Sequence, residues 1–223
     1  MNWQHIPKES TPLPTHGATY SDWKPELAEE GFHQCVYCTI SENSFGGIRN
    51  FHVEHYKPKG LKQFAHLEND FSNLYYACAI CNTFKSDDWT DPADDFSIGC
   101  YPDPSKKNYG ELFTIDTSTA LIAGKNVTGT YILTKLYLNR PQLIINRKEA
   151  IEEKSYQSLI HTVNEQKDAL FTLAAQGNSE ALQLLKELDS AVQALEAVFH
   201  AKESTNPYTP EQTKRRASKK DGS

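Results

Sequence analysis

Two cysteine pairs, Cys35-Val36-Tyr37-Cys38 and Cys78-Ala79-Ile80-Cys81-Asn82-Thr83-Phe84-Lys85, bracket a segment that contains Phe51-His52-Val53-Glu54-His55-Tyr56-Lys57-Pro58-Lys59. Each Cys-x-x-Cys pair can hold a metal ion through two thiolates, and two pairs complete a tetrahedral zinc site. The 39 residues between Cys38 and Cys78 exceed the interval of a compact zinc ribbon, so another folded unit is expected between the pairs. From the cysteines alone, a purely structural zinc module or two unrelated pairs also fit.

The intervening residues predict a hairpin followed by a helix. Residues 49–56 alternate between apolar and polar side chains, which indicates a strand. Residues 73–77 read as a second short strand, and residues 79–86 as one or two helical turns. The predicted unit of hairpin and helix therefore has a cysteine pair at each of its two ends.

Glu54, His55 and Asn82 supply the groups that phosphodiester hydrolysis needs. His55 suits a general base, because an unperturbed imidazole pKa of ~6.5 leaves the ring mostly neutral at cellular pH. Glu54 and the Asn82 side-chain oxygen are hard ligands suited to Mg²⁺ or Mn²⁺. Lys85 lies three residues after Asn82 and shares its helix face.

With Asn73-Leu74 before the second cysteine pair, these elements resemble the HNH endonuclease family and its ββα-metal fold. The resemblance implies that His55 is the general base, that Glu54 and Asn82 bind the catalytic metal, and that Asn73 braces the loop and orients the base. It implies a phosphate or leaving-group role for Lys85. The four cysteines match the structural zinc of a treble-clef-like subgroup. The expected fold class is α+β, with a zinc-stabilised core and a mostly helical C-terminal part.

A closer resemblance rests on residues 52–59, on Leu138-Asn139-Arg140-Pro141 and on the helical C-terminus. These look like the HNH subunits of bacterial anti-phage systems, namely Septu-type (PtuB-like) nucleases and relatives encoded beside retrons. The resemblance implies an ABC/SMC-like ATPase partner (PtuA-like), or a retron RNA–DNA.

The chain divides by composition into five segments. Residues 1–34 are expected to form an arm and a short helix that Ser21 caps, and residues 35–90 the core. Residues 91–138 predict an acidic loop, a hairpin within 111–123, and a helix capped by Asn126 or Thr128. Residues 139–202 predict a helical hairpin that turns at Gly177, and residues 203–223 a basic, disordered tail.

The second helix of this hairpin carries apolar residues at steps of three and four, which form a seam for another helix. The seam packs within the chain or docks a partner protein. Its members are Leu185, Leu188, Val192, Leu195 and Phe199.

Several further residues have two interpretations. His52 is an additional metal or phosphate contact, or a hydrogen-bonded structural histidine. Lys57, Lys59 and Lys62 either hold the nucleic-acid backbone or are ordinary surface lysines. The acidic stretch 87–95 is expected to be solvated or partner-facing rather than a second metal site. His33 is expected to be structural, and Cys100 a buried thiol.

Composition limits the location and the partners. A net charge of −6 argues against simple DNA binding through a basic surface. If the chain binds nucleic acid, the basic surface comes from local clustering of its positive charges or from a partner. With no signal-like N-terminus and no long apolar run, we expect a cytoplasmic protein that has no membrane partner.

The sequence therefore predicts a metal-dependent HNH endonuclease that acts on nucleic acid, with DNA as the expected substrate. The competing interpretation is a zinc-stabilised adaptor that binds nucleic acid or protein without cutting. A thioredoxin-like redox role fits poorly, because there are two cysteine pairs and no βαβ pattern.

Overall fold

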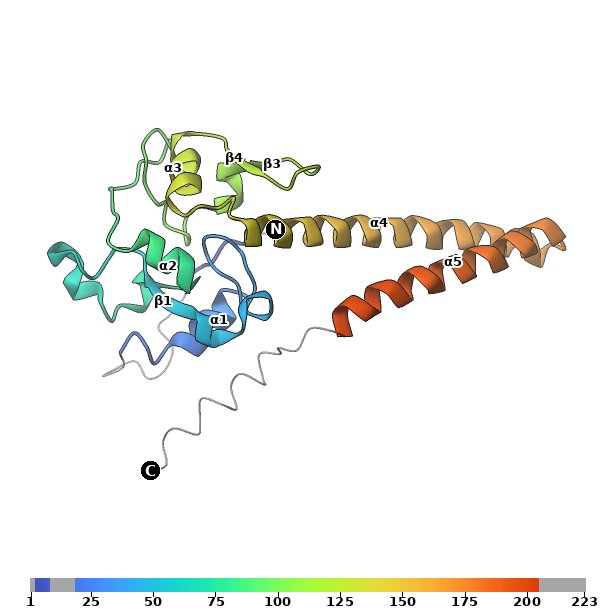
Figure 1. Ribbon diagram of the computed structural model, residues 1–223, viewed down its shortest axis with the longest axis horizontal. Helices are drawn as coiled ribbons and strands as arrows, with labels where there is room; N and C mark the ends of the chain where they lie inside the picture. Colours follow the sequence, from blue (N-terminus) through green and yellow to red (C-terminus); the bar gives the residue numbers. More distant parts are fainter. Residues whose placement is uncertain (1–2, 9–18, 205–223) are drawn as a thin grey trace, which may run out of the picture. The chain divides into compact units, whose positions relative to one another are not determined.

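The computed structural model describes residues 3–8 and 19–204, with side chains described as far as Val198. The described chain divides into two compact units, one reaching to Lys148 and the other beginning at Glu149 (Figure 1). The segment boundaries predicted at residues 90 and 138 stay predictions.

The first unit is organised around a two-stranded antiparallel sheet and the helix that follows it. Strands β1 (Phe51–His55) and β2 (Leu74–Cys78) pair so that Phe51 lies opposite Cys78 and His55 opposite Leu74. Helix α2 (Ala79–Lys85) starts directly after β2. This is the predicted hairpin and helix, with both strands shifted by a residue or two at their ends.

Helix α1 (Lys24–Glu30) lies against this sheet through Leu27 and Ala28, which are buried. The prediction that Ser21 caps α1 is wrong. The N-cap residue is Trp23, no side chain caps the helix, and Pro25 in the first turn has no N–H to be capped. Among the described residues, five short 3₁₀ turns lie in the connections, at Asn43–Phe45, Ile48–Asn50, Lys62–Leu67, Phe71–Asn73 and Tyr109–Leu112.

A second small sheet lies further along the first unit. Strands β3 (Phe113–Ile115) and β4 (Ile122–Gly124) form the predicted hairpin, and helix α3 (Val127–Lys135) contacts β4. Of the two predicted caps, Asn126 is the one used, since its side chain accepts a hydrogen bond from the Gly129 N–H at 2.7 Å. Thr128 is instead buried. The helix ends before Leu136 and Leu138, whose side chains enter the core.

The core of the first unit is rich in aromatic side chains. Phe51 and Tyr76 stack across the β1–β2 pair with ring centroids 4.6 Å apart. Tyr37, Tyr101 and Tyr109 form a second buried group. Cys100 is also buried, with its sulfur 3.8 Å from the Thr128 hydroxyl, as predicted for a plain buried thiol.

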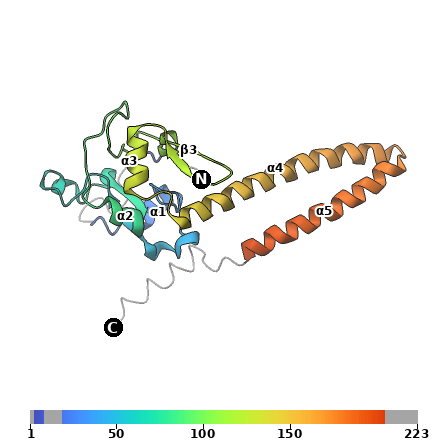
Figure 2. The same cartoon turned by 45° about the horizontal axis from the view of Figure 1, so that its top comes forward.

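Helices α4 (Pro141–Ala175) and α5 (Ser179–Ser204) are joined by the predicted turn, in which Gly177 adopts a φ of +89° (Figures 1 and 2). Lys167 and Asp189 form an ion pair between the two helices. Of the predicted seam residues, Val192 is buried and Leu185 and Leu188 are half-buried. Leu195 is 39 % exposed, so it is the least covered of the described seam residues. The Phe199 side chain lies outside the described residues.

The structure is therefore of the predicted α+β class, with two small sheets and a helical C-terminal part. Among the described residues, no helix is both long and apolar enough to cross a bilayer. Most of the predicted N-terminal arm lies outside the described residues. The side chains of the predicted tail, residues 203–223, also lie outside them.

Candidate active site

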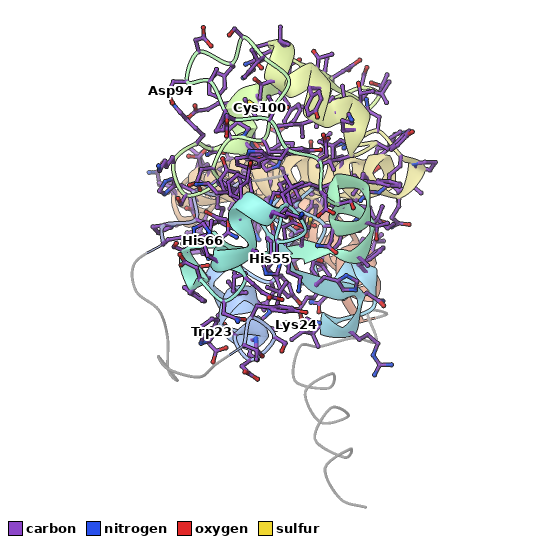
Figure 3. All side chains as sticks on the ribbon, turned by 90° about the vertical axis from the view of Figure 1, so that its left-hand side faces the viewer. Trp23, Lys24, His55, His66, Asp94 and Cys100 are labelled. Carbon is purple, nitrogen blue, oxygen red and sulfur yellow. The ribbon has the colours of Figure 1, made fainter. Side chains whose placement is uncertain are left out.

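The four cysteines Cys35, Cys38, Cys78 and Cys81 meet in one buried cluster. Their sulfur atoms all lie within 4.8 Å of one another, and the sulfurs of Cys38 and Cys78 are 3.8 Å apart. Zn–S bonds of about 2.3 Å in a tetrahedron place the sulfurs about 3.8 Å apart. The cluster therefore fits a structural zinc ion. The fifth cysteine, Cys100, is not a member of this cluster. Figure 3 shows it among the green and yellow segments of the first unit, apart from His55.

His33 lies outside this cluster. Its ring forms contacts of 3.2 Å with both Glu29 and Glu42. This placement agrees with the structural role predicted for it.

His55 ends strand β1 and has one ring nitrogen fixed. Its Nε2 lies 2.9 Å from the backbone carbonyl of Glu68. A carbonyl only accepts hydrogen bonds, so Nε2 carries the proton and Nδ1 keeps its lone pair. Burial lowers the pKa of His55 below its ordinary value, and the nearby Lys59 ammonium acts in the same direction. The ring is thus neutral near pH 7, as a general base requires.

Glu54 lies behind the base in a buried ion pair. Its Oε1 is 2.7 Å from the Lys85 ammonium, and both side chains are almost completely buried. Tyr37 donates a hydrogen bond to the same oxygen at 3.3 Å. Lys85 also donates to the backbone carbonyl of His55 at 3.0 Å, so one ammonium holds both members of the Glu-His pair. Oε2 of Glu54 accepts from the Asn82 amide instead.

Asn82 connects Glu54 to His52. The Asn82 amide donates to Oε2 of Glu54 at 2.6 Å, and its oxygen lies 3.2 Å from Nδ1 of the exposed His52. A cation held by both Glu54 and Asn82 needs the amide oxygen beside the carboxylate. Rotating the amide by half a turn provides this and turns its NH₂ group toward Nδ1 of His52, which can accept. The donor set therefore fits a hard divalent cation.

Asn73 holds the loop that follows the base. Its Oδ1 accepts from the Lys57 N–H at 2.8 Å, and its Nδ2 donates to the Lys57 carbonyl at 3.0 Å. The Asn73 carbonyl accepts from the Tyr56 N–H at 2.9 Å. These bonds tie the end of β1 to the start of β2, which agrees with the bracing role that the resemblance implies.

His52, Glu54, His55 and Asn82 line one cavity of about 540 Å³. Lys59, Lys24 of α1 and the exposed Asp87 also line it; Lys24 and His55 are labelled in Figure 3. Of the acidic stretch, Asp88 instead accepts hydrogen bonds from the hydroxyls of Tyr101 and Tyr131. Other predicted residues do not line the cavity, namely Asn73, Lys57, Lys62 and Lys85. Lys85 is buried beneath Glu54, and Lys57 lies with its ammonium 5.7 Å from the centre of the Phe64 ring.

The structure adds residues that the sequence pattern did not indicate. Tyr20 packs edge-on against the His55 ring at 5.0 Å, and the Lys59 ammonium lies 3.9 Å from the centre of the Tyr20 ring. Glu68 pairs with Lys59 at 2.7 Å while its carbonyl holds His55. In the sequence, Tyr20 lies just before the predicted first helix, and that position does not indicate a contact with His55.

The hairpin of β1 and β2 and helix α2 together place His55 beside the oxygen-bearing side chains of Glu54 and Asn82. Residues 35–88 match the family model described as HNH endonuclease, and this match supports a metal-dependent nuclease. No curated protein and no solved structure matches the chain.

The zinc assignment predicts the effect of losing one cysteine. Cys78→Ser removes a ligand at the junction of β2 and α2, so the purified chain should lose its single zinc and the near-ultraviolet circular dichroism of its core. Metal analysis and circular dichroism check this. Cys100→Ser, a buried thiol outside the cluster, should keep one zinc per chain. A Cys78→Ser protein with full zinc content would contradict the assignment.

The buried ion pair predicts a stability coupling. Lys85→Met leaves the Glu54 carboxylate buried without its partner and should lower the free energy of unfolding by about 3–5 kcal/mol. Adding Glu54→Gln removes the unpaired charge and should restore part of that loss. Denaturant unfolding of the zinc-loaded single and double variants measures the coupling. Additive losses would show that the two groups do not interact as described.

Proposed function

We propose that this chain is a divalent-cation-dependent endonuclease that hydrolyses phosphodiester bonds of nucleic acid, with DNA as the expected substrate. The observation that carries the proposal is the state of His55. Its Nε2 is bound to a backbone carbonyl, while no described residue forms a hydrogen bond with Nδ1. That nitrogen belongs to a residue lining the same cavity as Glu54 and Asn82.

His55 acts on the attacking water. Nδ1 accepts a proton from the water as its oxygen forms a bond to phosphorus, and the P–O3′ bond breaks. The leaving 3′ oxygen takes up a proton from solvent and His55 returns its proton to solvent, which gives 5′-phosphate and 3′-hydroxyl ends, as the HNH resemblance implies. The Glu68 carbonyl orients the imidazole throughout, because it accepts from Nε2–H whether or not Nδ1 is protonated.

Glu54 and Asn82 would hold Mg²⁺ or Mn²⁺. Such a cation supplies Lewis-acid stabilisation of the charge that develops on the phosphoryl and leaving oxygens. Lys85 serves this site indirectly, since its ammonium fixes Glu54 through Oε1, while Oε2 lies beside Asn82. This differs from the phosphate or leaving-group role that the resemblance implies for Lys85. Lys59 and Lys24 are the cavity-lining cations that can approach a phosphate.

The base assignment predicts that His55→Ala lowers the cleavage rate by about 100-fold or more. The assay is plasmid nicking by the full chain with Mg²⁺ or Mn²⁺, compared with a sample containing chelator. His66→Ala, which changes an exposed histidine that does not line the cavity, is the matched control and should cleave like the wild type. Equal cleavage by wild type and His55→Ala would exclude this mechanism. Binding without any cleavage would favour the adaptor.

We further propose that the nuclease is the effector of a bacterial anti-phage system of the Septu or retron-associated type, acting in the cytoplasm with an ABC/SMC-like ATPase. The proposal draws on the resemblance of residues 52–59 and 138–141. It is supported by exposed apolar side chains on α4 and α5. Five of them, each 45 to 66 % exposed, are Leu159, Phe171, Leu182, Leu184 and Val198.

If a partner protein covers α5, charged side chains placed on this helix should disrupt the complex. Leu184→Glu with Val198→Glu should abolish co-purification with the ATPase encoded beside this chain, while the zinc content stays unchanged. The matched control is Gln183→Glu with Gln193→Glu, which adds the same charge at exposed polar positions. Retention of the ATPase by the charged variant would show that this face of α5 is not the docking site.

A further inference from the structure

Arg140 lies against the cysteine cluster although it is far from it in the sequence. It precedes α4, 59 residues after Cys81 and outside the residues that match the HNH model. Its Nη2 is 3.5 Å from the sulfurs of Cys38 and Cys81 and 3.7 Å from the sulfur of Cys78. One NH₂ group therefore faces three of the four cysteine sulfurs.

The rest of the Arg140 guanidinium is held by the corner between α3 and α4. Nη1 donates to the carbonyl of Leu136 at 2.9 Å. The corner, residues 136–143, also contributes the buried side chains of Leu136, Leu138 and Leu143 to the core. The orientation of Arg140 toward the sulfurs is thus set by its own backbone surroundings.

A second arginine lies beside this corner without a carboxylate partner. Arg147 is completely buried and donates to the Ala120 carbonyl at 2.6 Å, the Leu138 carbonyl at 2.7 Å and Oδ1 of Asn139 at 2.8 Å. Within the part of the chain that the structure describes, neither Arg140 nor Arg147 forms an ion pair with an acidic side chain. Arg147 is fully buried and Arg140 half-buried, and charge withdrawn from water is costly unless a group of opposite charge lies nearby.

The cysteine cluster is the counter-charge that the fold offers. Zn²⁺ bound by four thiolates carries a net charge of −2, whereas four neutral thiols carry none. The negative charge is spread over the sulfurs, and three of these face Nη2 of Arg140. A guanidinium is suited to this contact because it is always charged and its donors are fixed in a plane.

We propose that Arg140 binds the zinc–thiolate cluster, so that zinc holds the corner between α3 and α4 on the nuclease core as well as holding the two cysteine pairs together. The proposal rests on the zinc assignment and not on nuclease activity. Zinc and the corner then stabilise each other. Loss of the Arg140 contact weakens zinc binding, and it also loosens residues 136–143, from which α4 starts.

The first test measures zinc affinity of the full chain by competition with a chromogenic chelator. Arg140→Met keeps most of the side-chain volume and removes the charge. It should bind zinc about 10- to 100-fold more weakly than the wild type, as outer-shell substitutions do. Arg140→Lys, which keeps the charge but not the planar donors, should fall between the two. Arg49→Met, at an exposed arginine, is the matched control and should equal the wild type.

The second measurement is amide hydrogen exchange of the zinc-loaded proteins. In Arg140→Met, the amides of residues 136–143 should exchange faster than in the wild type. The exchange rates of the amides in β1 and β2 should be unchanged. If Arg140→Met cannot be obtained folded, Arg140→Gln takes its place with the same expectations. Wild-type zinc affinity in the neutral variant, or unchanged exchange at the corner, would overturn the proposal. Neither readout depends on cleavage, so a failed nuclease assay would leave the result intact.

Discussion

The meeting of four cysteine sulfurs within 4.8 Å is the constraint on which the rest of the first unit depends. A two-stranded hairpin is at best marginally stable in water, and helix α2 has only seven residues. Neither would keep its position through its own hydrogen bonds. Because Cys78 is the last residue of β2 and Cys81 lies in α2, one zinc ion would fix the strand, the helix and the knuckle at Cys35 together. Asn82 follows Cys81 directly, so the same zinc ion would also fix the position from which its side chain extends.

The candidate active site is a series of polar contacts that passes from the core to the solvent. The ammonium of Lys85 is buried, Glu54 lies next to it, Asn82 is half-buried, and His52 is exposed. The buried end determines where the carboxylate lies, and the exposed end is free to exchange hydrogen-bond partners. A site built this way is rigid where a metal ligand must be held and adaptable where a substrate must enter.

Sequence reasoning recovered the parts of this arrangement that are local. Spacing and alternation predicted the strand that carries Glu54 and His55, the helix that carries Asn82, and the turn at Gly177. What it missed depends on contacts between distant segments. No sequence periodicity indicates that Tyr20 would pack on His55, or that Arg140 would reach the cysteines. The burial of Lys85 was missed because a lysine on a short helix is ordinarily exposed, and its partner Glu54 lies 31 residues earlier.

The carbonyl that holds His55 belongs to the backbone of Glu68. Every amino acid has this carbonyl, so the proton position on the imidazole does not depend on which side chain stands at position 68. The Glu68 carboxylate has a separate task, its pairing with Lys59. The surface charge beside the base can therefore change by substitution at one residue while the base keeps its tautomer. A change in the path of the loop itself, such as an insertion between Lys57 and Asn73, would instead alter the hydrogen bond to His55.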